Sequence, residues 1–147
     1  MPPELDDPIL LAAQARVGRV IREKWRLDRL LGLGGMAAVY AATHRNGKRV
    51  AIKMLHQAFS SVAEVRTRAL REGYVANRVE HPGAVSVLDD DVAEDGSVFL
   101  VMDLLDGESL NARWERQGKR LEPREVLSIA DKVLDVIAST SRSRANP

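Results

Sequence analysis

Alternating apolar and polar residues are the first feature of this chain, because such alternation predicts β-strands with one buried face. Lys24 to Leu31 alternates in this way and leads directly into a glycine-rich stretch. Asn46-Gly47, the strongest short-range signal for a hairpin, separates the next two candidate strands. The expected strands are 24–31, 36–44, 48–55, 86–91 and 97–105. The pattern therefore predicts a five-stranded antiparallel sheet.

The segment after the third strand has helical periodicity. Ser61-Val62-Ala63-Glu64 is a capping box, which predicts a helix starting there. The apolar positions of this helix are Val62, Val65, Ala69, Ala76 and Val79. The same stripe passes through Glu72, and a carboxylate on a buried helix face is costly unless it is paired. Glu72 is therefore either a buried, paired acid or a solvated side chain at the edge of the stripe.

Helical signals also flank this central region. Asp7-Pro8 can start a short helix within a loosely docked leader, 1–22. A short helix is expected within 107–117, and Pro123 opens a longer one. The apolar face of the longer helix consists of Leu127, Ala130, Leu134 and Ile137. We expect a leader at 1–22, a sheet domain at 23–106, helices at 107–138 and a disordered tail at 139–147.

Composition narrows the class of protein. The chain has 147 residues, of which 45% are hydrophobic and 29% charged, as expected for one globular domain. The formal net charge of +1 gives no reason to expect a nucleic acid partner. There is no cysteine, the three histidines lack metal-ligand spacing, and no apolar run is long enough to span a bilayer. We expect a cytoplasmic protein with no metal site and no membrane partner.

The glycine-rich stretch carries the candidate chemistry. Gly32, Gly34 and Gly35 place three glycines in four positions, so that the backbone can approach a ligand without a Cβ in the way. Lys53 ends the apolar stretch Val50-Ala51-Ile52, and can place one positive charge beneath that loop. A cation below an amide-rich loop is an anion site, although a turn and a solvated strand end explain the two features separately.

Together the two motifs read G-x-G-x-x-A-x-V followed by V-A-I-K. This combination resembles the small, ATP-binding lobe of a protein kinase, most closely that of bacterial serine/threonine kinases. Ala37 stands where the family often has the last loop glycine. The His81-Pro82 pair after the helix is also similar to the family pattern. The resemblance implies an α+β fold, with one main helix on the sheet, followed by the first helices of a truncated large lobe.

The resemblance also implies an ATP site. Its residues would be Leu31, Gly32, Gly34, Gly35, Val39, Ala51, Lys53, Glu72, Met102, Asp103, Leu105 and Glu108. In the family the lysine pairs with the helix glutamate. Leu31, Val39 and Ala51 would pack on the adenine, Met102 would be the gatekeeper, 103–105 the hinge, and Glu108 a ribose contact. Simple core packing explains Val39 and Ala51 equally well, and Glu108 could be an acid in the first turn of a helix.

Phosphate transfer needs a catalytic-loop Asp and a magnesium-binding Asp, and neither His-Arg-Asp nor Asp-Phe-Gly occurs in the sequence. We therefore expect no catalytic residue and an ATP-binding part of a kinase that is inactive alone, with Mg bound only if the missing lobe is supplied. The alternative is a non-catalytic module that binds another protein through the exposed last helix. A third interpretation is that the chain is a stable ATP sensor.

Overall fold

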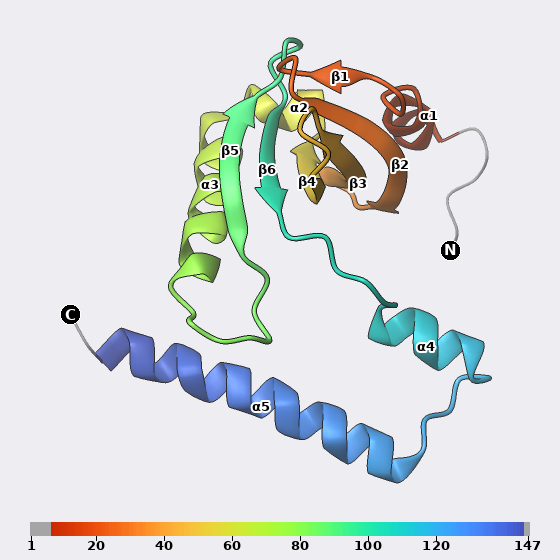
Figure 1. Cartoon of the computed structure of the whole chain (residues 1–147), viewed down its shortest axis with the longest axis vertical. Coiled ribbons are helices and arrows are strands. Elements are labelled where there is room, and N and C mark those ends of the chain that lie inside the picture. Colours follow the sequence, from red (N-terminus) through yellow and green to blue (C-terminus); the bar gives the residue numbers. More distant parts are fainter. Residues whose placement is uncertain (1–6, 146–147) are drawn as a thin grey trace. The chain divides into compact units, whose positions relative to one another are not determined.

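A curled antiparallel sheet forms the centre of the structure, with strand order β1-β2-β3-β4-β6-β5 (Figure 1). The chain is described from a computed structural model that covers residues 7–145, with side chains through Arg142. The strands are β1 (Val20–Ile21), β2 (Trp25–Leu33), β3 (Ala37–His44), β4 (Arg49–Leu55), β5 (Val87–Val92) and β6 (Val98–Met102). Five of them correspond to the predicted strands. The strand count of five was wrong, because β1 pairs with β2 as a sixth.

The sheet buries apolar side chains on both faces. Along β4, Val50, Ile52 and Met54 belong to a large cluster on one face. Leu55 belongs to a smaller cluster on the other, with Val98. The period of two along a strand explains this division, because successive side chains point to opposite faces. Helix α3 (Ala63–Asn77) packs on the face of the smaller cluster.

The turn between β3 and β4 forms where Asn46-Gly47 predicts it. The N–H of Gly47 donates to the carbonyl of His44, and the N–H of His44 donates to the carbonyl of Lys48, both at 2.8 Å. Gly47 has a φ of 90°, a conformation that side chains rarely tolerate. The glycine therefore fixes this hairpin, which in turn fixes the register of β3 on β4.

The leader contains the short helix that Asp7-Pro8 predicts. The helix is α1 (Pro8–Gln14), and the Asp7 carboxylate accepts a hydrogen bond of 2.9 Å from the N–H of Ile9. The expectation of loose docking was wrong: Ala13 is only 3% exposed, and its carbonyl accepts a 2.9 Å hydrogen bond from the Tyr40 hydroxyl. The apolar side of α1 covers the larger cluster, beside β2 (Figure 1).

Tyr40→Phe tests this docking. The substitution removes the hydroxyl and leaves the buried Ala13 carbonyl without its donor, which should lower the free energy of unfolding by about 1 kcal/mol. Tyr74→Phe is the matched control, because the Tyr74 hydroxyl bonds Asp90 at the exposed surface. Urea denaturation should show a change within about 0.5 kcal/mol for that variant. Equal effects of the two substitutions would contradict a docked leader.

The start of α3 differs from the prediction. Ser61 does not cap this helix; its hydroxyl donates to the Ala58 carbonyl at 3.1 Å and closes a short preceding helix, α2 (Gln57–Ser60). The capping-box motif was therefore misread, because the same serine can end one helix or begin the next. Helix α3 begins at Ala63 and runs to Asn77.

The chain divides into two compact units. The first comprises the residues up to Tyr74 together with Ser86–Leu104, and contains the sheet. The second comprises Val75–Val85 and the residues from Leu105 onward, and contains α4 (Leu110–Arg116) and α5 (Pro123–Ala145). Helix α4 begins at Ser109, whose hydroxyl accepts a hydrogen bond from the N–H of Ala112.

Helix α5 is longer than the sequence pattern predicts. The expected disordered tail was wrong as far as Ala145, because the helix continues to that residue; 146–147 lie outside the described residues, as do 1–6 of the leader. Ser139, Thr140 and Ser141 each donate a side-chain hydrogen bond to the carbonyl four residues earlier. These bonds satisfy the hydroxyls within the helix.

Within the second unit, α5 packs on the loop that contains His81-Pro82-Gly83. The His81 ring lies 2.8 Å from an Asp135 carboxylate oxygen. A Cβ on Gly83 would lie only 2.8 Å from Cγ2 of Val136, so glycine permits the close approach. The apolar face of α5 is largely exposed, including Leu127 at 70%. None of the helices within 7–145 is long and apolar enough to cross a membrane.

Candidate nucleotide site

The strand register gathers five expected site residues on one face of the sheet. Val39 lies opposite Lys53, and Ala51 lies opposite Met102 on the neighbouring strand. Lys53 and Ala51 are two residues apart on β4, so their side chains share a face. Gly32 pairs with Val39 at the start of the loop. The sheet thus places a cation, two small apolar side chains and a methionine beside the glycine-rich turn.

The glycines of the turn are not required by the local backbone or by packing. A Cβ on Gly32 or Gly35 would meet no atom within 4 Å, and one on Gly34 would meet only the Ala37 carbonyl, at 3.5 Å. None of the three has a positive φ. The side chain that each glycine omits would occupy open space above the sheet. This is the arrangement expected where a ligand approaches the backbone.

His56 secures the turn, a role that the sequence analysis did not find. Its ring Nε2 lies 2.8 Å from the Gly34 carbonyl oxygen, and its N–H donates to the Met36 carbonyl at 2.9 Å. The β3–β4 register could have indicated this contact. Ala37, the first residue of β3, pairs with Leu55, the last residue of β4. His56, which follows β4, must therefore lie opposite Met36, which precedes β3.

Lys53 carries a charge without an ionic partner. Its side chain is half-buried, and none of the ion pairs found within residues 7–145 includes it. Together with Leu55, Ala69 and Leu100 it lines a small gap of about 10 Å³ between the sheet and α3. An unpaired ammonium on the face that carries the glycine turn is available to an anionic ligand.

Glu72 does not lie where the helical stripe predicts. The buried residue of α3 is Gly73, and Glu72 is exposed and forms no ion pair with Lys53 in the described part of the chain. The reason is the close approach of Gly73 to the sheet, where an added Cβ would lie 3.2 Å from Cδ1 of Leu100. Successive helical residues point about 100° apart, so a buried Gly73 turns Glu72 outward. The prediction of an inward Glu72 was wrong.

The expected hinge is divided between the two units. Asp103 belongs to the first unit, and its N–H donates to the Ser86 carbonyl at 3.1 Å. Leu105 and Glu108 belong to the second. The Glu108 carboxylate accepts hydrogen bonds from Arg116, and these bonds lower the pKa of Glu108. Leu31 lies in the first unit at an irregularity between Leu30 and Gly32 and is exposed.

The residues of the first unit fit a nucleotide. The triphosphate of ATP is an anion, and Lys53 offers an unpaired cation beneath glycines that leave open space. Val39 and Ala51 are small apolar residues on the same face as Lys53, and Ala51 is only 6% exposed. Among residues 7–145, no three His, Cys, Asp or Glu side chains gather closely enough to hold a metal ion.

A curled antiparallel sheet with one helix on its face, a glycine-rich turn and a strand lysine opposite that turn defines a kinase-type small lobe. A family model described as "Protein kinase domain" matches residues 25–140. The chain belongs to the protein kinase family, and the resemblance expected from the motifs is confirmed.

Curated relatives are bacterial kinases. Serine/threonine-protein kinase pkn3 of Myxococcus xanthus is 35% identical over 123 residues, which are 83% of this chain and 22% of that protein. PknA of Mycobacterium tuberculosis is 38% identical over 122 residues, which are 80% of this chain and 28% of that protein. The chain thus spans about a quarter of the length of these relatives.

Solved structures agree with the fold. The crystal structure of the Mycobacterium tuberculosis PknI kinase domain superposes with a TM-score of 0.67 at 28% identity. The match covers 85% of this chain and 51% of that kinase domain. The expected α+β small-lobe fold is therefore confirmed, and the chain corresponds to part of a kinase domain.

Proposed function

We propose that this chain is the ATP-binding portion of a serine/threonine protein kinase, the family that transfers the γ-phosphate of ATP to Ser or Thr of proteins. The observation that carries the proposal is the position of Lys53. This unpaired cation lies opposite Val39 and on the face that carries the glycine turn. Family membership supports the same assignment.

In this proposal each site residue has a distinct role. The amides of Gly32, Gly34 and Gly35 and the ammonium of Lys53 bind phosphate oxygens. The adenine packs between apolar side chains, with backbone groups of the hinge at its edge. The residues assigned to the base and ribose are Leu31, Val39, Ala51, Met102, Asp103, Leu105 and Glu108.

We further propose that a polypeptide of these 147 residues transfers no phosphate. Its sequence contains neither His-Arg-Asp nor Asp-Phe-Gly, which in kinases supply the base and a magnesium ligand. Bound Mg would neutralise charge on the triphosphate, and the proposal requires a second polypeptide segment to hold it. ATP binding to this chain alone should therefore be weak.

Titration of the purified chain with Mg-ATP tests the proposal. We expect saturable binding by calorimetry that Lys53→Met weakens about tenfold or more, because a charge-assisted hydrogen bond to phosphate is lost. Lys48→Met is the matched control, because Lys48 is an exposed lysine at the end of the same hairpin. Its affinity should remain within about twofold of the parent chain, a difference that corresponds to about 0.4 kcal/mol.

Two results would contradict this assignment. Equal affinities of the Lys53→Met variant and the parent chain would remove Lys53 from the site. Transfer of labelled phosphate from ATP to the chain itself, lost in Lys53→Met, would show that the chain is a competent enzyme. Absence of transfer together with Lys53-dependent binding is the expected outcome.

A second candidate function is a non-catalytic interaction module. The observation in its favour is the exposed apolar face of α5, where Leu127, Leu134 and Ile137 are each more than half exposed. Exposed apolar patches usually mark interfaces. Size-exclusion chromatography with light scattering separates the two cases, since a stable monomer at high concentration argues against an uncovered interface helix.

A further inference from the structure

A cavity of about 360 Å³ lies on the face of the sheet opposite Lys53. Its apolar lining includes Ile21, Leu27, Met54 and Ala93, which belong to the larger core cluster. Met54 follows Lys53 on β4, so the two side chains point to opposite faces. The cavity is therefore separate from the candidate nucleotide site, and its volume falls within the range of small-molecule sites.

The wall formed by the leader is held in place by an ion pair. The Arg16 guanidinium lies 2.8 Å from an Asp95 carboxylate oxygen and 2.9 Å from the Ser97 hydroxyl, and it also contacts the Met54 sulfur. Only 16% of the Arg16 side chain is exposed. Arg16 and Asp95 both line the cavity, and each neutralises the other. Neither charge is therefore free for a ligand.

Val20 and Ile21 of β1 form a second wall, and the turn that follows β1 is also fixed. Arg22 and Glu23 have φ values of 53° and 55°, a left-handed conformation that is costly for residues other than glycine. The Glu94 carboxylate accepts a 2.6 Å hydrogen bond from the N–H of Arg22, and the Arg22 side chain pairs with Asp91. A hydrogen bond and an ion pair thus connect the turn to the β5–β6 hairpin. The cavity is therefore preformed.

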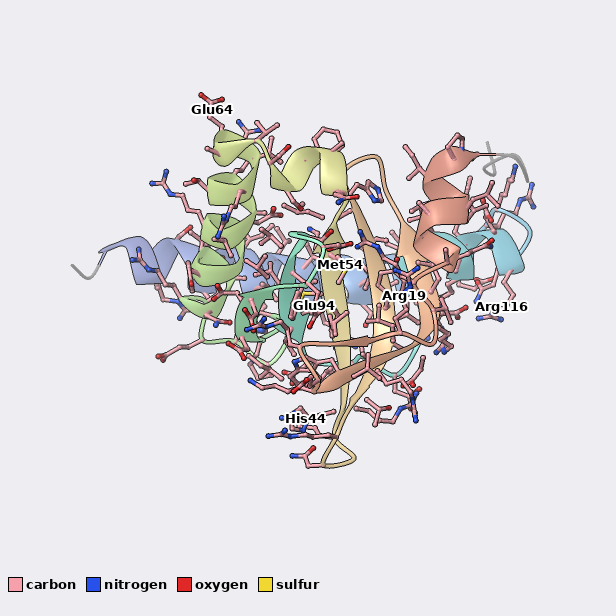
Figure 2. The ribbon with its side chains drawn as sticks, turned by 90° about the horizontal axis from the view of Figure 1, so that it is seen from above. Arg19, His44, Met54, Glu64, Glu94 and Arg116 are labelled. Carbon is pink, nitrogen blue, oxygen red and sulfur yellow. The ribbon has the colours of Figure 1, made fainter. Side chains whose placement is uncertain are left out.

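One cation at the rim forms no ion pair, and its charge helps to lower the pKa of nearby Asp95. Arg19 lines the cavity and is exposed, and none of the ion pairs within residues 7–145 includes it. Figure 2 shows Arg19, Met54 and Glu94 around this part of the lobe. Glu94 already accepts the Arg22 N–H, so Arg19 is the polar group best placed to select a ligand.

We propose that this cavity binds a small molecule with an apolar body and one carboxylate, with the body against Val20, Ile21 and Ala93 and the carboxylate on Arg19. Benzene occupies an apolar cavity of roughly 150 Å³, so about 360 Å³ accommodates two fused rings. Arg binds carboxylates through paired N–H donors, which adds geometric selectivity to charge. A carboxylate next to Glu94 would be repelled, which directs the acid toward Arg19.

The test uses 2-naphthoate and the full 147-residue chain. Ligand-observed NMR should show saturable binding with a Kd of about 1 mM or tighter. Arg19→Gln should raise that Kd about tenfold or more, because a charged hydrogen bond is lost. Arg29→Gln is the matched control, an exposed β2 arginine that does not line the cavity, and should bind as the parent chain does. The neutral analogue 2-naphthol should bind parent and Arg19→Gln equally.

A second variant keeps the test independent of Arg19. Val20 is 57% exposed at the cavity rim, so Val20→Trp should fill the opening without disturbing the core, and should abolish 2-naphthoate binding. Mg-ATP affinity should be unchanged in both variants, so this inference and the proposed function can fail separately. No saturable binding, unchanged binding in Val20→Trp and Arg19→Gln, or preference for a naphthylmethylammonium cation over 2-naphthoate would each overturn the proposal.

Discussion

Ile52→Ala is expected to lower the free energy of unfolding by about 3–4 kcal/mol. Ile52 is fully buried on β4, paired with Tyr40 on one side and Val101 on the other. The shortened side chain leaves a cavity at the centre of the sheet, where both neighbouring strands are fixed by hydrogen bonds and cannot collapse into the space. The lost transfer free energy of the removed side-chain atoms and the cost of the unfilled cavity therefore add in the destabilisation.

Ile137→Ala provides a control of identical chemistry. Ile137 is 54% exposed on α5, and alanine has the higher helix propensity, so we expect a change within about 0.5 kcal/mol. Urea unfolding monitored by circular dichroism measures both variants, and the transition midpoint should shift without a change in slope. A loss below about 1 kcal/mol for Ile52→Ala would show that the larger cluster is not a tightly packed core.

Asp95→Ala should cost about 2 kcal/mol at neutral pH. The substitution leaves the largely buried Arg16 guanidinium without its carboxylate. Breaking a fully buried pair costs about 3–5 kcal/mol, and the 38% exposure of Asp95 reduces that figure through solvent screening. Asp106→Ala, at an exposed aspartate, is the control and should be near neutral.

The same ion pair predicts a pH dependence. Burial alone would raise the pKa of Asp95, but hydrogen bonds from the Ser97 N–H and hydroxyl, and the charges of Arg16 and Arg19, outweigh burial and lower it. A carboxyl whose pKa is lower in the folded state stabilises the fold above its unfolded pKa of about 3.9. That contribution is lost as the pH falls through the folded value.

The stability of the parent chain should therefore decline below about pH 4, and the decline should be shallower in Asp95→Asn. Asp28 and Asp91 also have lowered pKa values and should retain part of the acid sensitivity. Urea midpoints measured between about pH 3 and 7 test this. Parallel pH profiles for parent and Asp95→Asn would contradict a stabilising Arg16–Asp95 pair.

The central part of the fold follows from the sequence because its signals are local and strong. The alternation of apolar and polar residues, the Asn46-Gly47 turn and the apolar run of β6 place five strands. The glycine-rich motif and the motif that ends at Lys53 together identify the family. The register then brings Val39, Ala51 and Lys53 together without further assumptions. The prediction of the fold thus rests on short-range sequence patterns.

The features that were missed depend on contacts between distant residues. β1 has only two residues, and its turn uses Arg22 and Glu23 in place of the usual asparagine and glycine, so no sequence signal marks it. The orientation of Glu72 depends on how closely Gly73 approaches Leu100. Periodicity places a helix face to within one residue, and one residue is enough to move a side chain from the buried to the exposed side.

Docking of α1 has a practical consequence for any shortened version of this protein. The match to the protein kinase family model begins at residue 25, after the leader helix and β1. A polypeptide trimmed to that boundary would expose Tyr40, Leu27 and the sulfur of Met54 to water and lose the Arg16–Asp95 pair. The folding unit therefore extends upstream of the start of that model match, and truncation at residue 25 should yield an aggregation-prone product.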